Sequence, residues 1–162
     1  MKDILFKNLP EESITGDEIF TGKRVVVFGL PGAFTPTCST KQVPSFDEYY
    51  DEILSHQIHE IYCVSVNDGF VMKAWFDGLN VEKVKYLADG SGEFTRRMGM
   101  LVKKDNLGFG MRSWRYAAVI DDGNVETIMA EDGFQDDCEI DPYENSSPAK
   151  VLNYLKNPDG NN

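Results

Sequence analysis

Apolar residues in this chain gather into short runs that alternate with longer amphipathic stretches. The runs 25–30 and 58–66 are almost continuously apolar, which predicts strands buried on both faces of a sheet, and 84–88 predicts a third strand. Between them, apolar residues recur at helical spacing over 38–55 and 70–79, which predicts helices. This alternation favours an α/β fold built on a central mixed sheet.

The rest of the chain follows from turn and cap signals. These predict small strands within an N-terminal extension over 1–24, a helix over 93–100, a loop over 107–110, a hairpin of 113–120 with 125–130, and a final helix capped by Ser147. Pro44 predicts a kink in the helix 38–55, because it lacks the N–H that continues the helical ladder. With no linker along its length, 1–162 is expected to form one domain that ends in a frayed polar tail, 157–162.

The charge balance is strongly acidic. The chain has 27 Asp and Glu against 16 Lys and Arg, a formal net charge of −11, with 41% hydrophobic residues. This composition fits a soluble globular protein and disfavours nucleic acid or an anionic membrane as a partner. The segment Met1–Lys7 has no signal-peptide pattern and no later segment reaches the length of a membrane span, so a cytoplasmic protein is expected.

Cysteine and histidine are few. Three cysteines, Cys38, Cys63 and Cys138, are too few and too far apart for a disulfide scaffold, which favours catalytic or incidental thiols. His56 and His59 are the two histidines, and there is no Cys-x-x-Cys motif. We therefore expect neither a metal site nor a bound cofactor.

Cys38 is the residue with the most informative surroundings. The buried strand 25–30 leads into a Pro/Gly turn, and Cys38 opens the helix that follows. Unpaired amide groups and the positive end of the helix dipole stabilise a thiolate at such a position. Thr35 precedes it by one helical turn and can donate to the sulfur or bind an oxygen presented to it, while Pro31 and Pro36 fix the backbone and can shield the thiolate.

A thiolate also needs a nearby cation, and the candidates are Arg112 and Arg115 at the entry of a predicted strand. Arg115 is the better candidate, because a guanidinium that enters a sheet needs an anion or several acceptors. Two plainer interpretations stay open from these residues alone. Cys38 could be a small buried apolar group, and Arg115 could form a surface ion pair in an acidic protein.

Four segments together resemble a known family. Residues 31–39 (PGAFTPTCS), 64–72, 88–92 and 112–116 closely resemble the peroxiredoxins, and specifically the subfamily of mammalian peroxiredoxin 5, plant type II peroxiredoxins and bacterial peroxiredoxin–glutaredoxin hybrids. The resemblance extends over about residues 2–155, without a glutaredoxin domain. It implies a thioredoxin-like fold with the N-terminal extension of peroxiredoxins.

The resemblance also implies roles for single residues. Cys38 would be the peroxidatic cysteine, which attacks hydrogen peroxide or an alkyl hydroperoxide and becomes a sulfenic acid in antioxidant defence. Thr35 and Arg115 would hold the peroxide and stabilise the leaving oxygen, and Pro31 would shield the sulfur. Relatives form homodimers through the active-site face. One departure is Gln42, where many relatives carry histidine.

A second thiol must reduce the sulfenic acid. Cys63 matches a cysteine of the plant relatives, but its place inside a buried strand favours a structural role. Cys138 roughly matches the resolving cysteine of mammalian peroxiredoxin 5, although the acidic residues around it over 136–141 would slow its attack. The alternative is a one-cysteine mechanism with glutathione, glutaredoxin or thioredoxin as external reductant.

Two other functions are compatible with the sequence. A thioredoxin-like disulfide oxidoreductase normally uses Cys-x-x-Cys, and Thr35 occupies the first of those positions. A redox-sensing interaction module would keep the fold without turnover. The apolar residues Phe46, Trp75 and Phe76 are candidates for a dimer surface.

Overall fold

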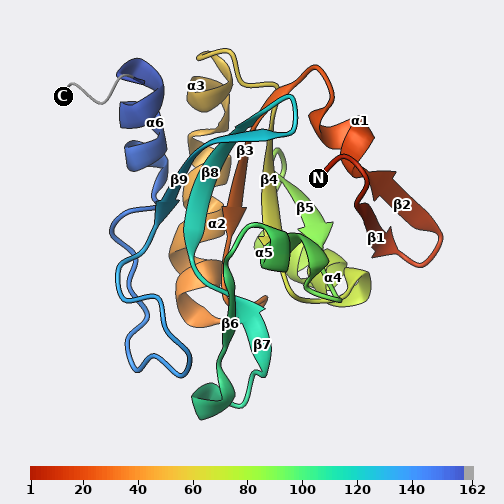
Figure 1. The fold of residues 1–162 in the computed structure, drawn as a ribbon, viewed down its shortest axis with the longest axis vertical. Coiled ribbons are helices and arrows are strands. Elements are labelled where there is room, and N and C mark those ends of the chain that lie inside the picture. The colour runs from red at the N-terminus through yellow and green to blue at the C-terminus, as the bar shows by residue number, and fades with distance from the viewer. Residues whose placement is uncertain (159–162) are drawn as a thin grey trace.

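The structure is a computed structural model that describes residues 1–158 and shows a mixed α/β fold (Figure 1). The predicted central mixed sheet is confirmed. The elements in chain order are β1 (Leu5–Leu9), β2 (Glu12–Thr15), α1 (Gly16–Phe20), β3 (Arg24–Gly29), η1 (Cys38–Gln42), α2 (Val43–Glu48), α3 (Tyr50–Leu54), β4 (Glu60–Ser65), α4 (Gly69–Leu79), β5 (Lys85–Ala88), α5 (Glu93–Arg97), β6 (Leu101–Lys103), η2 (Asp105–Leu107), β7 (Met111–Ser113), β8 (Tyr116–Asp121), β9 (Asn124–Ala130) and α6 (Pro148–Lys156).

The central sheet has five strands in the order β5-β4-β3-β8-β9. Strands β3, β4 and β5 are parallel, whereas β8 runs antiparallel to β3 and β9 antiparallel to β8. The pairing of β3 with β8 sets Gly29, the last residue of β3, opposite Tyr116, the first residue of β8. Segments that follow β3 and segments that precede β8 are thereby brought to the same edge of the sheet.

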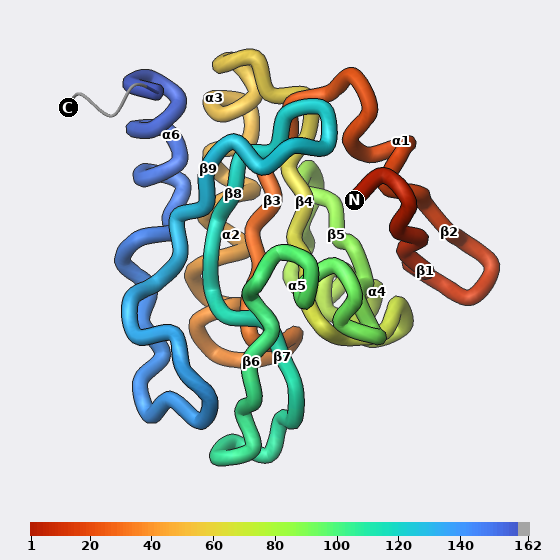
Figure 2. The backbone as a smooth tube through the Cα atoms, in the orientation of Figure 1, coloured from red at the N-terminus to blue at the C-terminus, as the bar shows by residue number. Residues whose placement is uncertain are grey.

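The continuous apolar run in β3 is explained by burial on both faces of the sheet. Val26 and Phe28 belong to one packed cluster, together with residues of α2, α3, α4 and α6. Val25 and Val27 belong to a second cluster, with residues of the N-terminal extension and of α5. In Figure 2, α5 lies in front of the sheet and α2 lies behind it. Because neighbouring side chains of a strand point to opposite faces, every residue of this run must be apolar.

The helix predicted over 38–55 is interrupted. Its first turn begins before Cys38, at Pro36. Residues 38–42 form a π-helical turn, in which the N–H of Val43 donates to the carbonyl of Cys38, five residues earlier. The turn stands directly before Pro44, which has no N–H to give to the ladder. A second interruption at Tyr49 separates α2 from α3.

The other predicted elements are found with shifted ends. The helix expected over 93–100 ends at Arg97, and Ser113 pairs with β6 in a separate two-stranded sheet, so that β8 begins at Tyr116. The short helix α1, which opens with a Thr15 capping box, was not predicted. Ser147 caps α6 as expected. The predicted frayed tail lies mostly outside the described residues.

The expected dimer surface is wrong. Phe46, Trp75 and Phe76 are all buried, with at most 7% of any of these side chains exposed. On α4 the buried face is formed by Met72, Trp75 and Phe76. These aromatic residues are core residues because α2 and α4 pack onto the sheet.

No helix within residues 1–158 is both long and apolar enough to cross a membrane.

We expect Phe46→Ala to lower the free energy of unfolding by about 3–5 kcal/mol, because it removes a ring from the packed core. The ring of Phe46 stacks on that of Phe28 at 4.1 Å between centroids, and neither residue is exposed. Urea unfolding followed by circular dichroism measures the change. The control is Phe70→Ala, since Phe70 is 65% exposed and its loss should change the free energy by less than about 0.5 kcal/mol. Equal effects of both substitutions would contradict this packing.

Candidate active site

Cys38 and Arg115 meet at one edge of the central sheet. Cys38 follows β3 after a turn, and Arg115 directly precedes β8, so the antiparallel pairing of these strands brings the two residues together. The Nη2 of Arg115 donates to the Sγ of Cys38 at 3.3 Å. Both residues are buried, Cys38 completely. Arg115 therefore points inward as predicted.

The turn before Cys38 is fixed from two sides. The backbone N–H of Ala33 donates to the Oδ1 of Asn67 at 3.0 Å, which ties the turn to the end of β4. The Nη1 of Arg112 donates to the carbonyl of Pro31 at 3.2 Å. A Cβ on Gly32 would stand 2.4 Å from that same Nη1, so this close approach requires glycine. Pro31 itself is buried in the turn.

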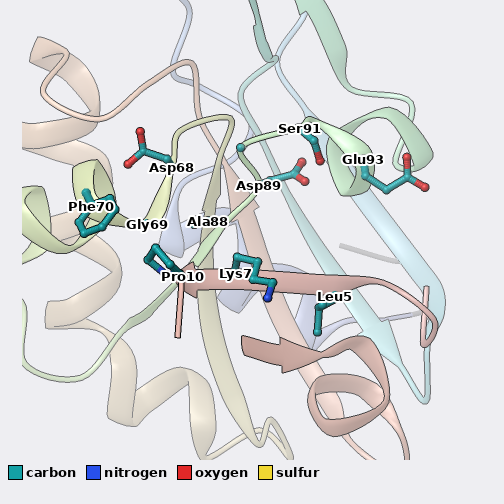
Figure 3. A pocket seen from close by; sticks show the side chains of 11 residues that line it. Leu5, Lys7, Pro10, Asp68, Gly69, Phe70, Ala88, Asp89, Ser91 and Glu93 are labelled. Carbon is teal, nitrogen blue, oxygen red and sulfur yellow. The ribbon is translucent and has the colours of Figure 1, made fainter. Parts of the chain in front are cut away.

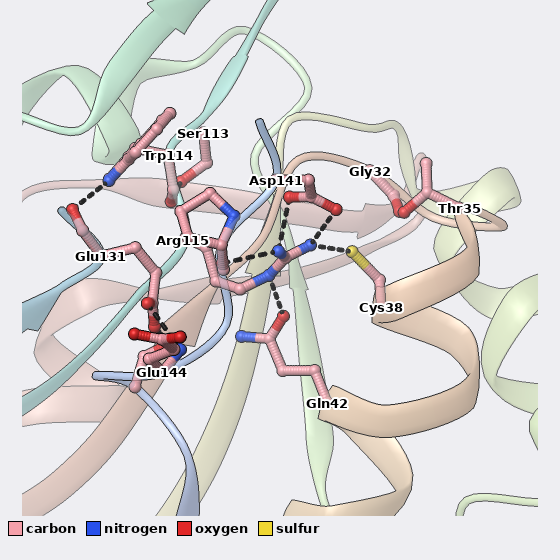
Figure 4. Close-up of polar contacts among 12 residues, drawn as sticks. Gly32, Thr35, Cys38, Gln42, Ser113, Trp114, Arg115, Glu131, Asp141 and Glu144 are labelled. Carbon is pink, nitrogen blue, oxygen red and sulfur yellow. Dashed lines mark hydrogen bonds and ion pairs between the residues drawn. The ribbon is translucent and has the colours of Figure 1, made fainter. Parts of the chain in front are cut away.

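Thr35 lies in the same turn, one helical turn before Cys38 (Figure 4). Its hydroxyl donates to the carbonyl of Gly32 at 2.8 Å and not to the sulfur. A hydroxyl that donates in this way keeps its lone pairs free to accept a further hydrogen bond. Thr35 can therefore accept a hydrogen bond from a hydroperoxide, which is one of the two roles expected for it.

The guanidinium of Arg115 is held on several sides (Figure 4). Its Nε donates to the Oε1 of Gln42 at 2.8 Å, and its Nη1 donates to Asp141 at 2.5 Å and to the carbonyl of Pro142 at 3.1 Å. Burial acts to lower the pKa of Arg115, but the charges of Cys38 and Asp141 outweigh it, so that this pKa lies above its ordinary value. The side chain is thus a fixed, permanent cation beside the sulfur.

Sequence reasoning missed the role of Gln42. It was noted only as a departure from relatives with histidine, yet its buried side chain links the π-helical turn to the strand edge. Its Oε1 accepts from Arg115 and its Nε2 donates to the carbonyl of Gly29 at 3.3 Å. The signal was available, since Gln42 stands four residues after Cys38 and on the same side of a helix.

Asp141 was also missed as an active-site residue, because it had been counted only among the acids around Cys138. It reaches Arg115 from the loop between β9 and α6, which we call the 131–147 loop. In the same loop, the ring of Tyr143 lies 5.8 Å from the guanidinium carbon of Arg115. A contact between residues 26 positions apart has no local signature in the sequence.

The other two cysteines lie in different surroundings. Cys63 is in β4, opposite Phe28, and belongs to the same packed cluster as Cys38. Burial raises the pKa of the Cys63 thiol well above its ordinary value, and the nearby Cys38 raises it further. Cys138 packs against Val102 and Trp114 in a separate cluster. All three cysteines are free and buried.

A separate hollow lies between the N-terminal hairpin and the loops that lead into α4 and α5 (Figure 3). Lys7, Pro10, Phe70 and Ser91 line it among others, and its lining includes neither Cys38 nor Arg115. Within residues 1–158, no three or more His, Cys, Asp or Glu side chains gather in a way that could hold a metal ion.

Comparison with known proteins identifies the family. Residues 1–145 match the model of the Redoxin family. The chain is 61% identical to peroxiredoxin y4vD of Sinorhizobium fredii over 142 residues, which cover 88% of this chain and 76% of that protein. It is 44% identical to the hybrid peroxiredoxin hyPrx5 of Haemophilus influenzae, over 88% of this chain and 57% of that protein.

A solved structure gives the same result. The antioxidant protein of Plasmodium falciparum, a 1-Cys peroxiredoxin, is similar with a TM-score of 0.87 and 40% identity, over 90% of this chain and 83% of that one. The chain belongs to the Redoxin family, and its relatives are peroxiredoxins. The predicted thioredoxin-like fold and thiol-dependent peroxidase function are confirmed.

We expect Cys63 to resist alkylation in the native protein. It is completely buried, and a raised pKa keeps its thiol protonated, whereas the thiolate is the form that reacts. Iodoacetamide at mildly alkaline pH, followed by peptide mass spectrometry, should leave Cys63 unmodified in the native chain and modify it in urea. Modification of native Cys63 at the rate of an unfolded cysteine would contradict the structural role assigned to it.

Proposed function

We propose that Cys38 is the peroxidatic cysteine of this thiol peroxidase and that Arg115 and Thr35 bind its hydroperoxide. The observation that carries this assignment is the buried hydrogen bond from Arg115 Nη2 to Cys38 Sγ, at 3.3 Å. A nucleophilic thiolate needs a cationic partner of this kind. Pro31 shields the sulfur from water by closing the turn beside it.

The proposed reaction needs no cofactor. The Cys38 thiolate attacks the terminal oxygen of hydrogen peroxide or an alkyl hydroperoxide, a S–O bond forms and the O–O bond breaks. The sulfur is oxidised to sulfenic acid, and the peroxide is reduced to water or an alcohol, which takes up one proton. Negative charge moves from sulfur to the leaving oxygen during this step. The Arg115 guanidinium, already fixed beside the sulfur, stabilises that charge without having to reorganise.

Thr35 completes the binding of the peroxide. With its own proton on the carbonyl of Gly32, the hydroxyl accepts the O–H of the hydroperoxide and aligns the O–O bond with the sulfur. Because Cys38 has no exposed surface, a neighbouring side chain has to move before a substrate reaches it.

We propose a one-cysteine mechanism for regeneration. Glutathione, with or without glutaredoxin, attacks the sulfenic acid to form a mixed disulfide and water, and a second thiol releases Cys38. Two features of the structure support this choice over Cys138. Cys138 packs in a different cluster from Cys38, and its loop is tied down where Asp137 N–H donates to the carbonyl of Lys103 at 2.8 Å. The likeness to a 1-Cys peroxiredoxin points the same way.

Residues 1–162 act as a single thioredoxin-like domain in a reducing compartment such as the cytoplasm, where cellular thiols regenerate Cys38. A second copy of the chain binds near the active site. The exposed rings of Phe34 (62%) and Phe70 (65%) support such a surface, whereas Phe46, Trp75 and Phe76 are buried.

We expect Cys38→Ser to lower peroxide consumption by at least about a thousandfold, because a serine hydroxyl stays protonated and cannot act as this nucleophile. Hydrogen peroxide with glutathione and glutaredoxin is the assay, and circular dichroism checks that the variant folds. A variant that keeps the parent rate would show that another residue carries out the reaction.

We expect oxidised protein to gain one glutathione on Cys38 when glutathione is added, as measured by the mass of the intact chain. In the one-cysteine mechanism the variant Cys138→Ser forms the same adduct and keeps the turnover rate of the parent. A loss of two hydrogens from the parent, with no adduct, would instead assign Cys138 as the resolving cysteine. It would leave the role of Cys38 intact.

A further inference from the structure

The carboxylate of Asp141 occupies the edge of Arg115 opposite to Gln42 (Figure 4). Its Oδ1 accepts from Nη1 at 2.5 Å and its Oδ2 accepts from Nη2 at 3.3 Å. Nη2 is also the donor to Cys38 Sγ, so one NH₂ group of the guanidinium stands between the carboxylate and the sulfur. A negative charge of the protein is thus held where an anionic part of a substrate would bind the guanidinium.

The 131–147 loop is built to hold Asp141 there. The buried carboxylate of Glu131, at the start of the loop, accepts from groups near its end: the backbone N–H groups of Glu144 and Asn145 at 2.7 and 2.9 Å, and the hydroxyl of Ser146. Glu131 thereby closes the loop upon itself. The loop reaches Arg115 through a segment whose conformation is set by buried hydrogen bonds.

The middle of the loop is fastened to β6 and η2. The N–H of Lys103 donates to Asp136 Oδ1 at 2.9 Å, and the N–H of Asn106 donates to Asp137 Oδ1 at 3.1 Å. Asn106 Nδ2 donates to the carbonyl of Cys138 at 3.2 Å. Asp141 lies between these two fastened parts of the loop, and the carbonyl of Pro142 and the ring of Tyr143 contact the same guanidinium.

We propose that Asp141 is a specificity-determining residue, which makes this peroxidase prefer neutral hydroperoxides over compact anionic ones. The proposal rests on the assignment of Cys38 and Arg115 given above. An anionic hydroperoxide must compete with the Asp141 carboxylate for Arg115 and approaches a second negative charge. Hydrogen peroxide and alkyl hydroperoxides carry no charge, so this repulsion is absent for them.

The side chain of Asp141 is also placed to give way to a neutral substrate. About half of it is exposed (49%), whereas Arg115 is 2% exposed and Cys38 is completely buried. Asp141 can therefore rotate towards water, whereas the other two side chains are enclosed by the protein. Its charge stays close to the entrance when it does so, and the discrimination against anions is therefore kept.

The test compares a neutral and an anionic substrate in Asp141→Asn. Hydrogen peroxide is the neutral probe, and peroxymonosulfate is a compact hydroperoxide that is anionic at neutral pH. Stopped-flow tryptophan fluorescence gives the rate constant of the reduced protein with each. Normalised to the parent, the ratio of the anionic to the neutral rate constant should rise about fivefold in the variant, the effect of about one partly screened charge contact.

The matched control is Glu139→Gln, which removes the same charge from an exposed position two residues away in the same loop. Its ratio should stay at the parent value. Asp141→Ser also removes the charge and should show the same rise as Asp141→Asn. If one of these two variants folds poorly, the other still provides the test. As a separate readout, acetate should inhibit both Asp141 variants more strongly than the parent, because it can then bind Arg115.

An unchanged ratio in both folded Asp141 variants, or an equal rise in Glu139→Gln, would overturn the proposal and leave the peroxidase assignment standing. The assignment itself would fail differently. In that case the variant Cys38→Ser would still react with hydrogen peroxide at the rate of the parent.

Discussion

The active site depends on one buried cation. Removing a guanidinium from water is costly unless acceptors surround it, and Arg115 finds them in two segments that are distant from it in the sequence, η1 and the 131–147 loop. Gln42 supplies an amide oxygen, the 131–147 loop supplies a carboxylate and a carbonyl, and Cys38 supplies the sulfur. The hydrogen bonds that compensate for burying Arg115 therefore also assemble the site, because each of them fixes its acceptor as well as the guanidinium.

The sheet explains why these segments meet. Parallel pairing of β3 with β4, and antiparallel pairing of β3 with β8, place the turn after β3 beside the entry to β8. Close packing at that point is visible at Gly29, where a Cβ would stand 2.2 Å from the ring of Tyr116. The Cys38 thiol and the Arg115 guanidinium thus lie at one rigid edge of the sheet, and the proposed charge-stabilising role of Arg115 requires such fixed geometry. The loop that adds Asp141 is held by hydrogen bonds within itself and by hydrogen bonds to β6 and η2.

Much of this could be predicted from the sequence, and the reasons are local. The apolar run 25–30 predicted a doubly buried strand, and Ser147 predicted a helix start, because burial and capping leave their pattern in adjacent residues. The predicted dimer surface was wrong because aromatic residues on a helix give the same sequence pattern whether they pack on a sheet or contact another chain. Phe46 and Trp75 turned out to be core residues.

The amino-acid sequence by itself determined the family, the α/β fold and the thiol peroxidase chemistry, since the turn, the cysteine and the helix that follows it are neighbours along the chain. The tertiary structure alone decided the partners of Arg115. The contacts with Gln42 and Asp141 span 73 and 26 positions, and such contacts depend on strand register and loop closure rather than on residue spacing. Hydrogen bonds between distant segments leave no periodic signal, so only the folded chain reveals which acidic residue reaches the cation.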